Sequence, residues 1–278
     1  MNVTPIQPSP VSWRTHVLWP GLAFGLAFAC IFEFDLDRSV AQTWFFDAAT
    51  QRWLGGGAGA WWAHDLIHTG GRAIVRSFAA IALAAWIISL LFDRWRHWRP
   101  EAGFVLCAFV SSIALVGGLK AITNVDCPWD LVGFGGHRPY VELLADRPDD
   151  LPRARCFPGA HSSSGFALIC GYFVLRNRSR RWARWALAAG IFAGFVFSAG
   201  QEARGAHFLS HDLAAASIVW FSQLLLYQRW QSALYSNNRA SEYPAMPVRR
   251  QPMMFREKHS QMPAATPPMR RGLNGEKS

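Results

Sequence analysis

Six stretches of almost uninterrupted apolar residues run through this chain, and they constrain its fold more than any other feature. They lie at 17–34, 73–92, 102–119, 162–175, 183–200 and 210–227. A helix needs roughly 20 mainly apolar residues to cross the hydrocarbon core of a bilayer. The sequence therefore predicts an all-α fold, a polytopic membrane bundle of six transmembrane helices. Because 162–175 is short for a bilayer, we expect it to begin below the membrane surface, or Arg176 to snorkel.

The composition agrees with a membrane protein and argues against two other classes. Of 278 residues, 51% are hydrophobic and 17% are charged, whereas an ordinary soluble domain carries about 25% charged residues. Despite the net charge of +10, so apolar a chain does not fit a nucleic-acid-binding module, and we expect no nucleic-acid partner. Five Cys without a CxxC pair fit neither a disulfide scaffold nor a zinc module.

The distribution of Lys and Arg predicts the orientation in the membrane. Segment 176–184 holds five Arg and no acidic residue, while 120–160 balances basic and acidic residues. Since short cytoplasmic loops are enriched in Lys and Arg, we expect a multi-pass protein of a bacterial inner membrane with both termini in the cytoplasm. No small-residue cleavage site follows the first apolar stretch, which indicates a retained helix and not a signal peptide.

Two domains are expected from the change in composition along the chain. Residues 1–230 form the transmembrane domain, and residues 231–278 form a basic, Pro-rich cytoplasmic tail. This tail has no apolar period that could bury a core, so we expect it to be disordered.

Three clusters of unusual polar residues return to the outer side in this topology. Lys120 ends the third stretch, His161 opens the fourth, and Arg204, His207, His211 and Asp212 lie between the fifth and the sixth. Ionisable groups at membrane depth are costly and usually face a cavity or one another. The clusters therefore indicate one shared site facing the periplasm.

The residue types at this site suit phosphoryl transfer. A phosphate monoester calls for Lys and Arg donors and for free backbone N–H groups at a helix start, which Gly159, Ala160 and Ser162 can supply. Alternatively, the serines of this segment only cap the helix. A His nucleophile needs a group that fixes its tautomer, and a leaving alkoxide needs an acid. His207 and His161 can divide the roles of nucleophile and acid.

Three blocks of the chain resemble the motifs of the membrane-bound type 2 phosphatidic acid phosphatase (PAP2) superfamily. They are Lys120-x6-Cys127-Pro128, Pro158-Gly-Ala-His161 and Gln201-x5-His207-x3-His211, similar to Lys-x6-Arg-Pro, Pro-Ser-Gly-His and Ser-Arg-x5-His-x3-Asp. The resemblance covers roughly residues 100–227 and agrees in order, spacing and membrane side. It implies a six-helix membrane phosphatase.

Three of the departures from these motifs affect charged positions. Cys127 and Gln201 stand where the family pattern has Arg, and His211 stands where it has Asp. Arg204, one helical turn from Gln201, and Asp212, next to His211, are candidates to substitute. Arg138 and Arg155 in the predicted outer loop are two further candidate cations.

The two cysteines predicted on the outer side offer a second bridge between motifs. An oxidising periplasm permits a disulfide, so we hypothesise that Cys127 and Cys156 tie the first motif to the second. The alternative is a pair of free thiols. Cys30, Cys107 and Cys170 lie in apolar stretches and are interpreted as packing residues.

Two histidine pairs also have spacing that can bind metal. His64 and His68, next to Asp65, could hold zinc, but beside two Trp we interpret them as part of an interfacial helix in the first outer loop. His207 and His211 could bind a metal with Asp212 and His161. We prefer phosphate there, because it also explains Lys120, which otherwise would only face lipid headgroups.

The sequence thus predicts an integral membrane lipid phosphate phosphatase with a phosphohistidine intermediate. His207 is the nucleophile, His161 is the acid, and His211 or Asp212 orients His207. The phosphate-binding groups are Lys120, Arg204, Gly159, Ala160 and Ser162. No cofactor and no metal are expected, and the partners are a phosphorylated lipid substrate and membrane lipids.

Several alternatives stay open at this point. The intermediate could pass to a second lipid, which would make the protein a phosphotransferase. The chain could be a non-catalytic lipid-binding or transport protein that kept the fold, or a metal-dependent membrane hydrolase. The residues do not distinguish phosphatidate from phosphatidylglycerol phosphate, a polyprenyl diphosphate or a lipid A phosphate. They also do not give the oligomeric state.

Overall fold

The computed structural model describes residues 11–57, 59–143 and 145–242. These residues form an all-α bundle, as predicted, with one small hairpin of β1 (Phe46–Asp47) and β2 (Arg52–Trp53). The last helix continues to Glu242, beyond the predicted domain boundary at residue 230. The rest of the predicted disordered tail, residues 243–278, lies outside the described residues.

Five helices of the described chain are long and apolar enough to cross a membrane. They comprise α1 (Trp19–Glu33) with η1 (Arg14–Leu18), α3 (Gly71–Leu91) with η3 (Trp62–Gly70), α4 (Arg99–Ile122) with η4 (Asp93–Trp98), α7 (Arg180–Ala203) and α8 (Leu209–Glu242). The predicted fourth stretch is the shorter helical segment Ala160–Leu175. It consists of α5 (Ala160–Phe166), η6 (Ala167–Ile169) and α6 (Cys170–Leu175). Five of the six predicted stretches are therefore candidate membrane spans by length and composition.

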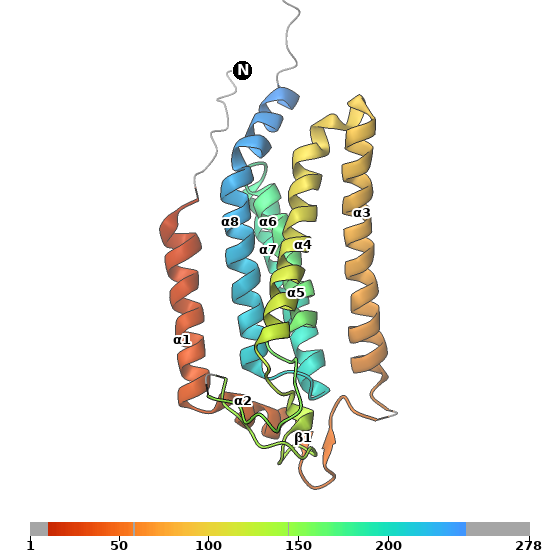
Figure 1. Cartoon of the computed structure of the whole chain (residues 1–278). Coiled ribbons are helices and arrows are strands. Elements are labelled where there is room, and N and C mark those ends of the chain that lie inside the picture. The colour runs from red at the N-terminus through yellow and green to blue at the C-terminus, as the bar shows by residue number, and fades with distance from the viewer. Residues whose placement is uncertain (1–10, 58, 144, 243–278) are drawn as a thin grey trace, which may run out of the picture. The chain divides into compact units, whose positions relative to one another are not determined.

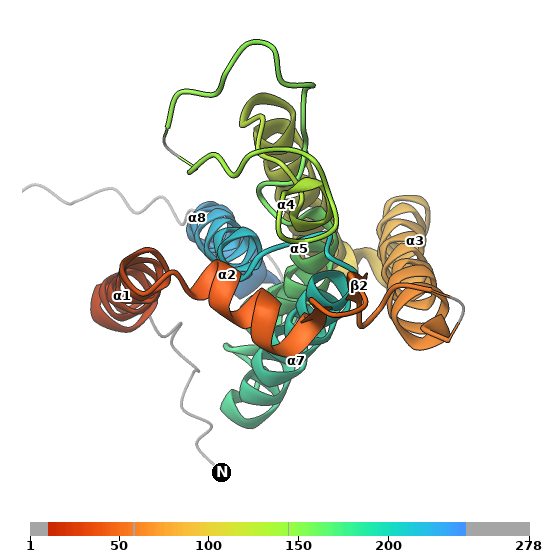
Figure 2. The same ribbon diagram turned by 90° about the horizontal axis from the view of Figure 1, so that it is seen from below.

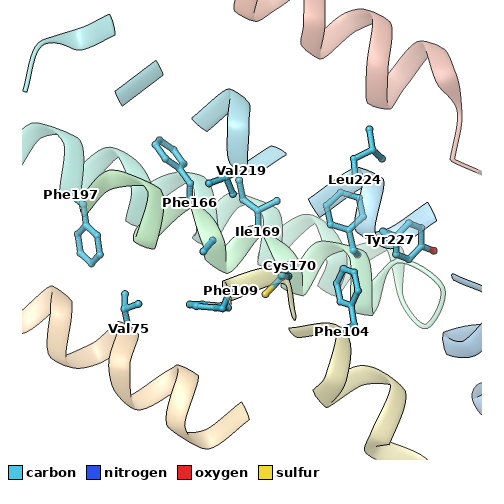
Figure 3. Packing of buried hydrophobic residues seen from close by; sticks show 13 residues of the cluster. Val75, Phe104, Phe109, Phe166, Ile169, Cys170, Phe197, Val219, Leu224 and Tyr227 are labelled. Carbon is cyan, nitrogen blue, oxygen red and sulfur yellow. The ribbon is translucent and has the colours of Figure 1, made fainter. Parts of the chain in front are cut away.

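The short segment Ala160–Leu175 lies at the centre of the apolar core. Its buried side chains meet those of α4, α7 and α8, as Figure 3 shows for Phe166, Ile169 and Cys170. Glycines let α7 approach closely, because a side chain at Gly190 or Gly194 would overlap Ile169 or Phe166. Small residues serve the same purpose at helix contacts in membranes.

The outward faces of the long helices are apolar. Ile81 and Leu91 of α3 and Phe192 and Phe195 of α7 are among the large exposed hydrophobic side chains. Exposing such surfaces to water costs free energy, whereas in a bilayer they contact the hydrocarbon chains of the lipids. The chain is thus compatible with a membrane-embedded bundle.

One end of the bundle gathers the basic turns. Arg178, after α6, forms an ion pair with Glu101 at 2.6 Å and lies over the ring of Trp98. The turn between α6 and α7 therefore lies beside the start of α4. Both the beginning of α1 and the end of α8 are at this end (Figure 1).

The opposite end is covered by α2 (Leu36–Val40), η2 (Ala41–Phe45) and the loop that contains η5 (Pro128–Asp130). Figure 2 shows α2 across this end of the bundle. Asp37 of α2 accepts hydrogen bonds from the backbone N–H (2.8 Å) and Oγ (2.5 Å) of Ser210 in the first turn of α8. Burial raises the pKa of the Asp37 carboxyl. An N-terminal helical element thus caps the helix that carries part of the third motif.

The loop between α4 and α5 is held by covalent and ionic links. Cys127 and Cys156 form the disulfide hypothesised above, with Cα atoms 5.1 Å apart. Buried Asp126 pairs with Arg138 and with Arg147. This pairing raises the pKa of the Arg138 guanidinium. The first and second motifs are therefore joined at the base of this loop.

Candidate active site

A cavity of about 650 Å³ opens at the end covered by α2. Its walls come from α3, α4, α5, α7 and the loops before α5 and α8. The predicted site residues that line it are Lys120, Ala160, His161, Arg204 and His207. All three motifs thus contribute to a single cavity, as the sequence predicted.

His207 lies in the turn between α7 and α8 with only 5% of its surface exposed. Its Nδ1 is 2.7 Å from Oδ1 of Asp212. Since the carboxylate accepts a hydrogen bond from Nδ1–H, the proton of the neutral ring stays on Nδ1 and Nε2 carries the free lone pair. Burial, with the nearby positive charges of Lys120 and Arg204, lowers the pKa of His207 to about 3. The ring is therefore neutral near pH 7, the form that a nucleophile requires.

Asp212 is itself fixed from the start of α5. Its Oδ1 accepts a second hydrogen bond from Oγ of Ser162 at 2.6 Å. A side chain on Gly159 would overlap Asp212 Oδ1 and Ser162 Oγ and would come within 3.0 Å of the His207 ring. Only glycine fits there. Gly159 and Ser162, which we predicted to bind phosphate, are therefore packed behind His207 and are not among the lining residues of the cavity.

His211 does not hold the His207 ring in this structure. Its imidazole packs edge-on against Phe157 and Phe208, with centroids 5.5 and 5.7 Å away. It lines a separate small cavity. The contribution of His211 near the site is its backbone carbonyl, which accepts the N–H of Gly159 at 2.9 Å. Of the two residues that the sequence left open, the geometry favours Asp212.

His161 lies in the first turn of α5 and faces the cavity. Its ring stacks on Phe197 at 4.6 Å, and its centroid is 4.7 Å from that of His68. Within the described chain, its buried Nε2 has no hydrogen-bond partner. A ring nitrogen left open in a cavity wall can exchange a proton with a ligand there.

The cavity is strongly basic. Besides Lys120 and Arg204, its wall includes Arg72, Arg76 and Arg155, and no acidic residue is among the described residues that line it. Lys120 Nζ is 3.5 Å from the carbonyl of Cys156, and burial lowers the pKa of Arg204. Arg138 is not available to this cavity because it pairs with Asp126. The arrangement is suited to a multiply charged anion.

Four of the lining residues, of which three are polar, come from a helix to which the sequence assigned no site residue. His68, Arg72 and Arg76 lie four residues apart and share one face of the helix Trp62–Leu91. Their regular spacing within an apolar segment was the available signal. His64, by contrast, is exposed and pairs with Asp65 at 2.8 Å. Neither the His64 pair nor the His207 pair belongs to a cluster of three or more metal-ligating side chains among the described residues.

Comparison with known families gives one match. Residues 101–234 match the model of the PAP2 superfamily. No curated protein and no solved structure matches the chain. The matched range contains Lys120, His161 and His207, while His68, Arg72 and Arg76 precede it. The family and the apolar helices together support a membrane phosphatase-type function.

Proposed function

Because this chain belongs to the PAP2 superfamily, we propose that it is an integral membrane phosphatase that removes phosphate from a lipid through a phosphohistidine intermediate. One observation carries the proposal. The neutral His207, held by Asp212, shares a basic cavity with Lys120, Arg204 and His161.

In the first step, Nε2 of His207 attacks phosphorus in line with the lipid oxygen. The nitrogen–phosphorus bond forms as the bond from phosphorus to the lipid oxygen breaks, and His161 gives its proton to that oxygen. Lys120 and Arg204 stabilise the charge on the phosphoryl oxygens. Asp212 accepts the hydrogen bond from Nδ1–H and stabilises the positive ring that results.

In the second step, His161 takes a proton from water. The hydroxyl attacks phosphorus, the bond to His207 breaks, and inorganic phosphate leaves. Both histidines return to their starting protonation states. No metal ion enters this scheme, because the cations of the cavity supply the charge stabilisation that a metal would give.

We place the cavity at the periplasmic face of a bacterial inner membrane, with both termini of the chain in the cytoplasm. The orientation is supported by Arg94, Arg96, Arg99 and the five Arg of 176–184, since they lie in or next to the connections α3–α4 and α6–α7, at the end opposite the cavity. Positively charged short loops favour the cytoplasmic side. The cavity then opens where outer-leaflet lipids carry their headgroups.

The test is a phosphate-release assay of the full chain in nanodiscs. The panel contains phosphatidate, phosphatidylglycerol phosphate, a polyprenyl diphosphate and lipid A phosphate, each with and without a chelator. We expect release from at least one lipid, no effect of the chelator, and loss of activity in His207→Ala. His64→Ala is the matched control and keeps wild-type activity, because His64 is exposed and is not a lining residue.

Three outcomes would each contradict the proposal. Wild-type turnover by His207→Ala would show that His207 is not the nucleophile. Activity abolished by the chelator would indicate a metal-dependent hydrolase. Binding of lipid phosphate without release would indicate a non-catalytic protein, unless a phosphorylated acceptor lipid accumulates, which would identify a phosphotransferase.

A further inference from the structure

We propose that His68 is a substrate-binding residue of this site and that Gln201 is its positioning residue. The inference rests on the proposed function, because it assigns a hydrogen bond to the phosphoryl group in the same cavity. His68 precedes the range that matches the family model. Gln201 stands at the motif position where an Arg is usual.

The hydrogen bonds of Gln201 determine how its side-chain amide is oriented between Arg204 and His68. Its side chain is buried, with 3% of the residue exposed. Nη1 of Arg204 donates to Oε1 of Gln201 at 3.2 Å, and Nε2 of Gln201 is 2.8 Å from Nδ1 of His68. A guanidinium can only donate, so the amide oxygen must face Arg204. The amide nitrogen then donates to Nδ1 of His68.

This orientation determines the tautomer of His68. With Nδ1 acting as an acceptor, the neutral ring carries its proton on Nε2. Nη1 of Arg72, one helical turn further on, lies 3.5 Å from this Nε2. In this tautomer, two N–H donors therefore lie side by side in the wall of the cavity. Among the described residues no side-chain acceptor bridges them, and a phosphoryl oxygen would serve both.

The position of His68 suits that role. Its ring centroid is 4.7 Å from that of His161, the proposed acid, and both residues line the cavity with Arg204. Gln201 thus does not replace the missing Arg directly. It hydrogen-bonds to two donors from different parts of the chain, Arg204 in the turn after α7 and His68 in η3, and orients both toward the anion.

The experiment measures kcat and KM for phosphate release, and the affinity for inorganic phosphate by calorimetry, in five full-length variants. These are His68→Ala, His68→Gln, Gln201→Ala, the double variant His68→Ala/Gln201→Ala, and the control His64→Ala. A hydrogen bond to a charged group is worth about 10- to 100-fold in the relevant constant. We expect His68→Ala to lose that much in kcat/KM and to bind phosphate more weakly, while His64→Ala matches wild type.

Two further results separate positioning from a general effect on folding. The double variant should lose little more than His68→Ala alone, because Gln201 acts through His68 and neighbouring residues in one network are not additive. His68→Gln should recover part of the loss, since its amide can still donate into the cavity. The His68→Gln variant should elute in gel filtration and unfold thermally as wild type does.

The inference is overturned if His68→Ala equals His64→Ala in both assays, or if the losses of His68→Ala and Gln201→Ala multiply in the double variant. Calorimetry keeps this test apart from that of the proposed function. If wild type binds phosphate but releases none from any lipid, the proposed function fails, and the effect of His68→Ala on phosphate affinity still decides the inference.

Discussion

The carboxylate that holds His207 lies one residue later than the family spacing predicts. Successive residues of a helix point about 100° apart, so His211 and Asp212 face different directions from the first turn of α8. Gly159 and Ser162 pack on the Asp212 side. The His211 ring instead contacts Phe157 and Phe208. The direction in which each residue of the first turn points therefore decides which of them orients His207, the proposed nucleophile.

Asp212→Asn should separate these two residues. The neutral amide accepts from Nδ1–H more weakly than a carboxylate and can turn its NH2 toward the ring. His207 is then no longer fixed in the tautomer with its proton on Nδ1, and its positive form is less stabilised. Loss of such a carboxylate in a comparable triad costs about 10⁴-fold in kcat, and we expect a loss of about 10³- to 10⁴-fold with KM little changed. Steady-state phosphate release from the same lipid measures it. A larger loss in His211→Ala than in Asp212→Asn would contradict the assignment.

At the scale of elements, the loop between α4 and α5 brings two motifs together. The disulfide joins its ends, and the Asp126 pairs with Arg138 and Arg147 fix its interior. Thr123 Oγ1 also donates to the carbonyl of Phe157 at 2.5 Å. These links set the end of α4, with Lys120, against the start of α5, with His161.

Removing the disulfide should lower stability more than activity. The bond closes a loop with a sequence separation of 29, for which chain entropy gives a stabilisation of about 3–4 kcal/mol. We expect Cys127→Ser/Cys156→Ser to unfold at a lower temperature than wild type in detergent. Adding a reductant should lower the melting temperature of wild type but not of this variant. Cys30→Ser/Cys107→Ser is the matched control. Free alkylation of both Cys127 and Cys156 in unreduced wild type would contradict the bond.

The elements also show what the sequence could and could not predict. Apolar runs located the five long helices and the segment Ala160–Leu175, because burial in lipid requires them, but they did not indicate α2. They missed the start of the second helix, which begins at Trp62 and not at residue 73, since His64, Asp65 and His68 interrupt the apolar pattern. Spacing identified Lys120, His161 and His207. The contact between His68 and Gln201 joins residues 133 positions apart, and no local pattern indicates such a pair.

At the scale of the whole molecule, the basic turns and the basic cavity lie at opposite ends of the bundle, and this separation explains the proposed orientation in the membrane. Arg residues resist transfer across the membrane, while the cations around Lys120 are gathered in a cavity that a phosphate can neutralise. In the proposed orientation, Arg residues would thus retain one end of the bundle in the cytoplasm and bind substrate at the other.

Reporter fusions in a bacterial host test this orientation. Alkaline phosphatase fused after Asp150, in the loop between α4 and α5, should be active, because that enzyme folds only in the periplasm. Green fluorescent protein fused after Arg178 should fluoresce, since the proposed orientation puts that turn in the cytoplasm. The reverse pattern would place the cavity in the cytoplasm.

The central claim is that His207 carries the phosphoryl group during turnover. The most direct measurement is to quench the reaction with a lipid labelled at its phosphate, digest the protein, and locate the label by mass spectrometry. The account predicts an alkali-stable, acid-labile phosphohistidine on the peptide that contains His207, absent from His207→Ala. A label on any other residue, or steady release of phosphate with no labelled protein at early times, would contradict it.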